Sequence, residues 1–354
     1  MVQCFHRGVS PARLRRADLP EPQVPGTDGI DIELRRIYLR RYVPADEGCS
    51  LVTTSISPAE ARGRSREQFS ERLLNGSIKK SYDPVVDIDW DAPLDPDKFF
   101  LPPQMVTLYG TPQWDAMTRD QQRELSRQQL VNMLSAGIWF ENILNQALLR
   151  SIMHTNPTAK ATQYMLTELG DETRHMVMFG KAIDRVGGIP VRPSLFQRII
   201  INALPFTFRG PVLWAAALVG EEIFDSLQRQ ILDDPELQPI VRRLMRIHVT
   251  EEARHIQFAR EGLRKLAPAM PWYRKVLMAN VHGVGGPFYR MLFTLPVYYN
   301  RAGLDGEQMR QIARANPHFR QKCRESFAPL GSFFEEVGLM GRLSRWMWRR
   351  AGFR

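Results

Sequence analysis

The feature that most constrains this 354-residue chain is a Glu-x-x-His motif that occurs twice, 80 residues apart. The two copies are Glu172–His175, within DETRH, and Glu252–His255, within EEARH. Residues three positions apart share one face of a helix, so each copy can present a carboxylate and an imidazole to one point. One such motif alone is usually a solvated helix face, but two copies at a fixed offset indicate a paired site.

A further glutamate precedes each motif by 31 residues. These two glutamates are Glu141, with Ile138, Leu144 and Leu148 on its helical face, and Glu221, with Ala217, Leu218 and Phe224. Both carboxylates therefore point where apolar side chains point. An unpaired carboxylate in that position costs on the order of several kcal/mol, and metal coordination removes this cost. The pattern predicts a two-fold internal repeat.

Helical periodicity predicts four long helices, at about 118–153, 158–186, 211–233 and 235–267. Short connections between long helices are typical of an antiparallel bundle. The link at 187–210 is longer, and it can cross over the bundle. We therefore predict an all-α fold with a four-helix bundle at its centre.

The six residues of the repeat form the ligand set of a carboxylate-bridged dinuclear metal site. They are Glu141, Glu172, His175, Glu221, Glu252 and His255. Four carboxylates cancel the charge of two divalent cations, and two imidazoles complete a shell that suits iron or manganese. Glu222 is the alternative to Glu221, but it shares its face with polar residues. A pseudo-symmetric bundle with a vestigial site is the remaining structural alternative.

His248 lies four residues before Glu252 on the same helical stripe. It can be a third histidine ligand, although a lone histidine is more often a hydrogen-bonded core or surface residue. Its counterpart in the first half of the repeat is Glu168.

Charged residues beside the histidines can support them. Asp171 and Glu251 each lie four residues before a motif histidine, so Asp171 is expected to orient His175 and Glu251 to orient His255. Arg174 and Arg254 occupy matched positions, from which they can pair with these acids across the bundle.

The chain divides into four predicted segments. These are a loosely ordered basic arm (1–60), a lead-in rich in proline, aspartate and aromatics that packs on the bundle (61–117), the bundle (118–267), and a C-terminal helical extension (268–354). Proline excludes a long helix from the part of the lead-in at 82–115.

Composition restricts the setting in which the protein works. Three widely separated cysteines, Cys4, Cys49 and Cys323, exclude a disulfide framework. The first twenty residues have no apolar core of a secretory signal, so we expect a cytoplasmic protein. The net charge of +10 is spread along the chain, and we predict no nucleic-acid partner.

One cluster stands out from this spread of charge. Residues 341–354 hold five arginines, two tryptophans and no acid. They are either a solvated helix or a surface for weak contact with membrane lipid or a partner.

At these motifs the sequence resembles the p-aminobenzoate N-oxygenase (AurF-type) family of ferritin-like di-iron oxygenases. The resemblance rests on the paired motifs, on His248, on the lead-in DIDWDAPLDPDKFFLPPQ with LYGTPQWDAM, and on ENILNQALL after the single glutamate. It covers about residues 80–265.

The resemblance implies a ferritin-like bundle in which two iron ions activate O₂ and oxygenate a small amine. The ligands it implies are Glu141, Glu172, His175, Glu221, His248, Glu252 and His255. It also implies an external electron donor of the ferredoxin or reductase type and a homodimer.

Other functions remain open at this point. A di-iron desaturase or hydroxylase acting on an acyl chain shares the ligand set. A ribonucleotide reductase small subunit is disfavoured, because no tyrosine is identified for a stored radical. A non-catalytic helical membrane-surface or interaction protein with a vestigial site belongs to another class. Seven titratable ligand candidates on inward stripes argue against it, since no structural role requires them.

Overall fold

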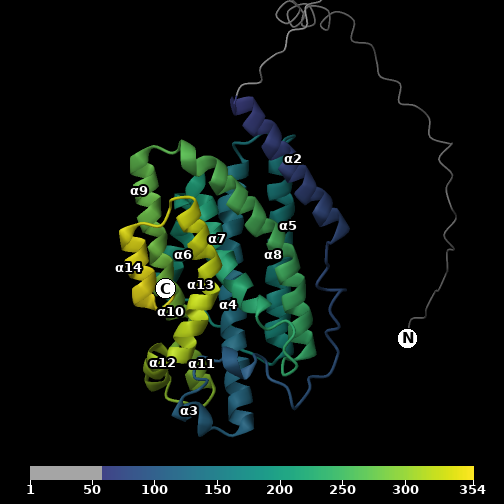
Figure 1. Cartoon of the computed structure of the whole chain (residues 1–354). Coiled ribbons are helices and arrows are strands. Elements are labelled where there is room, and N and C mark those ends of the chain that lie inside the picture. The colour runs from purple at the N-terminus through teal and green to yellow at the C-terminus, as the bar shows by residue number, and fades with distance from the viewer. Residues whose placement is uncertain (1–57) are drawn as a thin grey trace, which may run out of the picture. The chain divides into compact units, whose positions relative to one another are not determined.

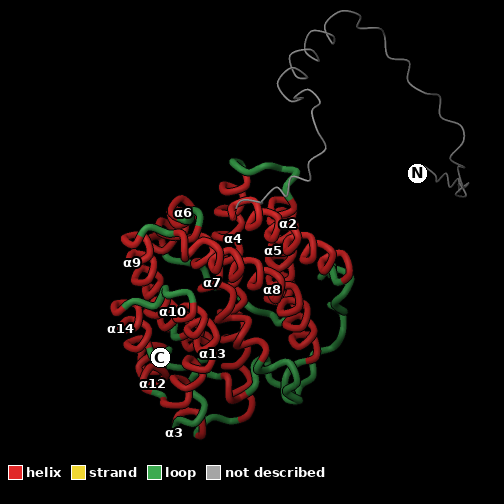
Figure 2. The backbone as a smooth tube through the Cα atoms, turned by 45° about the horizontal axis from the view of Figure 1, so that its top comes forward, coloured by secondary structure: helices red, strands yellow, loops and turns green. Residues whose placement is uncertain are grey.

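The structure, a computed structural model, describes residues 58–354. Within this range every regular element is a helix, apart from one isolated bridge between Phe99 and Leu237. Figure 2 shows the same arrangement as helices joined by loops. The predicted all-α class is confirmed. No helix in the described range is long and apolar enough to cross a membrane.

Four long helices form the bundle: α4 (Arg119–Ile152), α5 (Lys160–Arg185), α7 (Pro211–Arg229) and α8 (Pro239–Leu266). Helix α4 contacts α5 and α7, and α8 contacts the same two, so the four helices close into a ring. Figure 1 shows α4, α5, α7 and α8 side by side. All four predicted helices exist, with ends shifted by a few residues.

Local chemistry explains where these helices begin and end. Thr118 and Gln121 form a reciprocal capping box at the start of α4. Helix α5 ends at Arg185, and Gly187 just beyond it has a φ of 65°, which favours a residue without a Cβ. Helix α8 begins at Pro239 rather than at the predicted Pro235, because the backbone before it pairs with Phe99.

The link between α5 and α7 runs along α4 and contains a helix that was not predicted, α6 (Leu195–Thr207). Arg127, near the start of α4, donates to the Gly187 carbonyl at 2.7 Å. Further along α4, Arg150 lies 4.0 Å from the ring centre of Phe206. The predicted crossover is therefore confirmed, and it makes α5 and α7 run in the same direction.

The first part of the predicted lead-in is a helix, α2 (Pro58–Lys79), which packs against α5 and α8. This helix was not predicted. Phe69 and Leu73 lie one helical turn apart and turn towards the bundle, while Ser70 and Ser77 bond back to backbone carbonyls of the preceding turn. The predicted arm at 1–60 lies outside the described residues except for the first three residues of α2.

The part of the lead-in at 82–115 forms no long helix, as expected. It contains only η1 (Pro103–Met105) and α3 (Pro112–Asp115). Phe99, Phe100 and Leu101 are buried, so the segment is ordered by packing on the bundle.

The C-terminal extension is a set of shorter helices. In chain order these are η2 (Ala267–Ala269), α9 (Trp272–Val281), η3 (His282–Val284), α10 (Gly285–Phe293), α11 (Pro296–Arg301), α12 (Gly306–Ala315), α13 (Pro317–Glu336) and α14 (Arg342–Ala351). Helices α10 and α11 pack against α4, and α13 packs against α7.

Helix α14 divides the two C-terminal tryptophans between core and surface. Trp348 is fully buried and stacks on Phe327 with ring centres 4.1 Å apart, whereas Trp346 is 60% exposed. A Cβ at Gly285 would lie 3.0 Å from the Trp348 ring, which explains the glycines at this crossing. Helix α14 is therefore not wholly solvated, which counts against one of the two alternatives for this segment.

Candidate metal centre

Six of the seven predicted ligands converge in the interior of the bundle. They form two groups whose ligand atoms lie within 4.8 Å of one another: Glu141, His175, His248 and Glu252 in the first, and Glu172, Glu252 and His255 in the second. All six side chains are buried. Glu252 belongs to both groups, so its carboxylate can bridge two cations.

The distances around Glu252 define the centre. Its Oε1 lies 3.3 Å from Nδ1 of His175 and 3.4 Å from Nδ1 of His255. Glu172 Oε1 lies 2.8 Å from the same nitrogen of His255. Each imidazole therefore turns one nitrogen towards the carboxylates in the middle.

The other nitrogen of each histidine donates to an outer oxygen. His175 Nε2 donates to Glu251 Oε2 at 2.9 Å, and His255 Nε2 donates to Asp171 Oδ2 at 3.2 Å. An outer acceptor of this kind fixes the tautomer and leaves the inner nitrogen free to bind a metal.

These outer pairs correct the sequence analysis. We expected Asp171 to orient His175 and Glu251 to orient His255, but each acid serves the histidine of the other helix. The reason is the direction in which each acidic side chain leaves its helix. Asp171 on α5 and Glu251 on α8 both point towards the neighbouring helix, and not towards the histidine on their own helix. Arg254 reaches Asp171 across the bundle at 3.3 Å, as expected, whereas Arg174 pairs with Asp171 within α5.

Replacing Asp171 with asparagine is therefore expected to affect His255 and to leave His175 in place. The amide keeps the shape but weakens the acceptor, and loss of such a partner costs about 10–100-fold in metal affinity or activity. Metal titration of the purified variant measures this effect. Asp184→Asn, an exposed change on the same helix, is the control, and an affinity within twofold of the control would contradict the assignment.

His248 lies at the centre. Its Nε2 is 3.6 Å from Glu141 Oε1 and 3.6 Å from Glu252 Oε1, and its Nδ1 donates to Gln228 Oε1 at 2.7 Å. Gln228 was missed by the sequence analysis, although it lies two helical turns after Glu221 on the same stripe. Like the two motif histidines, His248 turns one nitrogen inward and donates from the other, but here Nε2 is the inner nitrogen instead of Nδ1. This arrangement favours the ligand interpretation.

We expect His248→Ala to keep the fold and to bind less metal per chain, because one inward nitrogen is lost. Elemental analysis with far-ultraviolet circular dichroism measures both quantities. The exposed His154 is the matched control. If His248→Ala retains the metal content of His154→Ala, then His248 is a hydrogen-bonded core residue instead.

Glu221 is buried but lies outside both groups. Neither of its carboxylate oxygens has a hydrogen-bond partner among the described residues. Its neighbour Glu222, the alternative ligand, is also buried, but it pairs with Arg260, whose Nε lies 3.0 Å from Oε2. Glu222 is thus committed to an ion pair, and Glu221 remains the carboxylate that α7 offers to a metal.

Two further polar residues near the centre carry no predicted role. Glu168, the counterpart of His248, is buried, and burial raises its pKa to about 8. Tyr164 lies one turn before it, with its hydroxyl buried and unpartnered within the described range. The repeat offset was the signal for Glu168, and helical spacing places Tyr164 beside it. Only the tertiary structure shows that Tyr164 also lies near His255.

The raised pKa values of several ligand side chains indicate that, without metal, the site binds protons in place of cations. Burial, reinforced by the Glu172 and Glu252 carboxylates, raises the pKa of Glu141 well above its usual range. Burial opposes the charging of His175, but hydrogen bonds to the surrounding carboxylates raise its pKa well above the ordinary value. Burial lowers the pKa of His248 to about 4. Cations entering this site would displace protons.

The unpartnered atoms provide a direct test of metal fit. Both oxygens of Glu221, Oε2 of Glu252 and Nε2 of His248 are buried without a hydrogen-bond partner among the described residues. Buried polar atoms are nearly always satisfied in folded proteins. Oxygen and imidazole donors left in this state, facing one interior, fit a pair of transition-metal ions.

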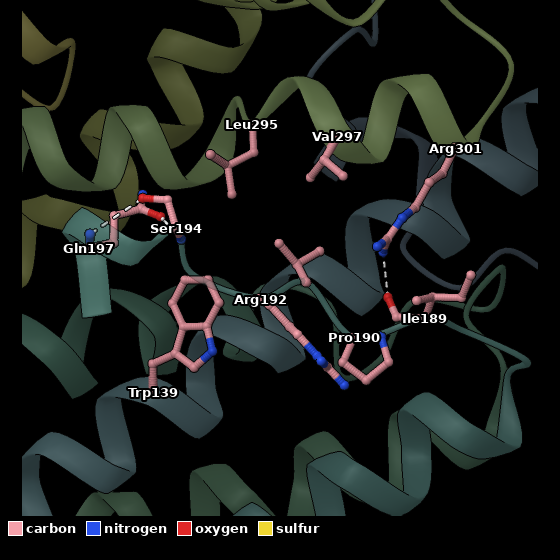
Figure 3. Close-up of a pocket in the computed structure, with 10 residues that line it drawn as sticks. Trp139, Ile189, Pro190, Arg192, Ser194, Gln197, Leu295, Val297 and Arg301 are labelled. Atoms are coloured by element: carbon pink, nitrogen blue, oxygen red, sulfur yellow. Dashed lines mark hydrogen bonds between the residues drawn. The ribbon is translucent and has the colours of Figure 1, made fainter. Parts of the chain in front are cut away.

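A cavity of about 450 Å³ lies elsewhere, on the outer side of α4. Its walls include Trp139, Arg192 and Arg301, and none of the candidate ligands lines it (Figure 3). Trp139 precedes Glu141 by two positions, about 200° around a helix. The cavity therefore faces away from the metal centre.

Comparison with known proteins agrees with this geometry. The model of a protein family described as P-aminobenzoate N-oxygenase AurF matches residues 63–338. Relatives that are 28% identical over 291 residues come from Mycobacterium tuberculosis strains CDC 1551 / Oshkosh and ATCC 25618 / H37Rv and from Mycobacterium bovis strain ATCC BAA-935 / AF2122/97. Each alignment covers 78% of this chain and 84% of the relative, and each relative is named an uncharacterized protein.

Proposed function

Because the chain belongs to the p-aminobenzoate N-oxygenase AurF family, we propose that it is a non-haem di-iron oxygenase that oxygenates the nitrogen of a small amine. The observation that carries the proposal is the convergence of Glu141, Glu172, His175, His248, Glu252 and His255 in one buried interior. No structural role requires three imidazoles and three carboxylates with unpartnered atoms in a helical core.

The residues of the chain would hold the metals as follows. Glu141, His175 and His248 face one position, Glu172 and His255 face the other, and Glu252 lies between them. Glu221 completes the set from α7. Iron, when bound here, supplies the redox chemistry that activates O₂.

The surrounding side chains hold the three imidazoles in place and cover them. Glu251, Asp171 and Gln228 hold the three imidazole rings by their outer nitrogens. The Phe179 ring lies 5.0 Å from that of His248 and covers it from the apolar side. A buried site with hydrogen-bonded ligands suits oxygen transfer to substrate rather than loss of oxidant to water.

The proposed reaction requires partners. Converting an amine to a hydroxylamine consumes O₂, two electrons and two protons and releases one water. An external donor of the ferredoxin or reductase type would supply the electrons, which suits a protein of the cytoplasm. We also propose that the chain works as a homodimer, as the family resemblance implies.

Turnover with isotopically labelled O₂ tests the proposal. Iron-loaded protein, a chemical reductant and p-aminobenzoate or another arylamine should yield a product with labelled oxygen on nitrogen, detected by mass spectrometry. A saturated fatty acid is the parallel substrate for the acyl alternative, and protein loaded with manganese tests the metal.

The outcomes separate the alternatives. A labelled hydroxy acid from the fatty acid alone would replace the amine proposal with a hydroxylase, and an unlabelled unsaturated acid would replace it with a desaturase. No oxygen consumption by protein that carries two irons would contradict both enzymes and favour a vestigial site.

A further inference from the structure

A charge asymmetry independent of the metal centre runs through the chain. Segments 185–220, 262–304 and 337–354 contain fifteen lysines and arginines and no aspartate or glutamate. Since the whole chain has a net charge of +10, the remaining residues carry a net charge of −5. The positive charge is therefore concentrated in three acid-free segments.

Most of these three segments fold onto one side of the bundle; the exceptions are Arg185 at the end of α5 and Arg264 and Lys265 in the last turn of α8. Helices α6, α9 and α14 lie along the same side in Figures 1 and 2, opposite α2, α5 and α8. Helix α14 is tied to α9 by Ser344, whose hydroxyl donates to the Ala279 carbonyl at 2.6 Å. Helix α10 joins the others, since Arg290 donates to the Arg350 carbonyl at 3.0 Å and Met291 contacts Gln197 of α6. We call the exposed residues of α6, α9, η3 and α14 the cationic face.

Large apolar side chains are exposed across the cationic face. Of twenty exposed large apolar residues in the described range, thirteen lie in the acid-free segments. Trp272 is 78% exposed, Tyr273 55% and Trp346 60%, and α6 adds Leu195, Ile199 and Phe206. Soluble monomers rarely leave such a patch uncovered, so the face is expected to bind something.

The cations between these apolar residues are available to a partner. Arg198, Arg209, Arg274, Arg342 and Arg349 are exposed, and none forms an ion pair with an acid among the described residues. Arg345 and Arg354 differ, because both pair with Glu335 at the edge of the face. The free cations call for an anionic partner.

The cavity beside α6 has matching chemistry. Arg192 crosses the middle of the cavity in Figure 3, and Trp139, Leu295 and Val297 form apolar walls. No acid lines it. A cation beside apolar walls fits a phosphate group joined to an acyl chain.

We propose that the cationic face docks on a bilayer containing anionic phospholipid. Interfacial tryptophan and tyrosine with interspersed arginines form the usual composition of surfaces that lie in the headgroup region. Each arginine near such a bilayer adds attraction that a neutral surface lacks. A second copy of the chain fits less well, because a two-fold interface would bring the same unpaired cations together.

Vesicle sedimentation with the full-length, metal-loaded chain tests the proposal. The protein should sediment with vesicles of phosphatidylcholine mixed with phosphatidylglycerol and stay in solution with phosphatidylcholine alone. Raising the salt from about 0.1 M to about 1 M shortens the Debye length from about 10 Å to about 3 Å. This screening should release most of the bound protein.

Matched charge reversals locate the surface. Arg274→Glu with Arg342→Glu and Arg349→Glu should lower the vesicle affinity by at least about 100-fold. Arg72→Glu with Lys79→Glu and Lys80→Glu, exposed positions on and beside α2, should leave it within a few-fold. Trp272→Ser with Trp346→Ser should weaken binding while the metal content stays unchanged.

Three results would overturn the proposal. The first is equal sedimentation with neutral and anionic vesicles, or with neither. The second is an equal loss of affinity in the two charge-reversal variants. The third is a tryptophan variant that changes from dimer to monomer in gel filtration yet binds vesicles normally, which would make the face a contact between two copies.

Discussion

Replacing Glu252 with alanine is expected to empty both metal positions at once. Glu252 is the residue shared by the two ligand groups, and its Oε1 lies 3.3–3.4 Å from the inner nitrogens of His175 and His255. Without it, neither cation keeps a complete shell, and the two cations would repel across the gap. Metal content should fall from two ions per chain to background, and oxygen consumption should fall with it.

The control for this prediction lies on the same helix. Glu261 pairs with Lys265 on the outer side of α8, at 3.0 Å, and has no contact with the centre. Glu261→Ala should therefore retain both ions, and circular dichroism should show the same helix content in both variants. If Glu252→Ala still binds two ions with unchanged affinity, the bridging position is assigned wrongly.

Stability is expected to depend strongly on metal. A ligand that binds only the folded chain stabilises it by about 4 kcal/mol when its free concentration is about 1,000 times its Kd. Removing the metal with a chelator should therefore lower the free energy of unfolding by several kcal/mol, measured by denaturant titration. An equal free energy with and without metal would indicate a vestigial site.

Two neighbouring glutamates should respond in opposite ways. Glu221→Leu removes a buried carboxylate whose two oxygens are unpartnered, so the metal-free protein should become more stable while the gain from metal shrinks. Glu222→Leu leaves Arg260 without its partner and should destabilise the protein by about 1–3 kcal/mol with and without metal. Destabilisation of the metal-free protein by Glu221→Leu would contradict the assignment of Glu221.

The sequence determined the fold class and most of the candidate centre, because both depend on periodicity along a helix. Spacing of three residues places Glu172 with His175 and Glu252 with His255 whatever the neighbouring helices do. The offset of 31 residues located Glu141 by the same logic. Capping residues such as Thr118, and glycines such as Gly187, marked the helix ends because those interactions are local in the chain.

Only the tertiary structure decided which side chains meet between helices. Asp171 and Glu251 serve the opposite histidines, and Gln228 serves His248, because these pairings depend on how α5, α7 and α8 are rotated against one another. Helical period gives the direction in which a side chain leaves its own helix, but it contains no information on what stands across the gap. The same packing brings Arg260 to the buried Glu222. It also gathers most of the three acid-free segments on one face.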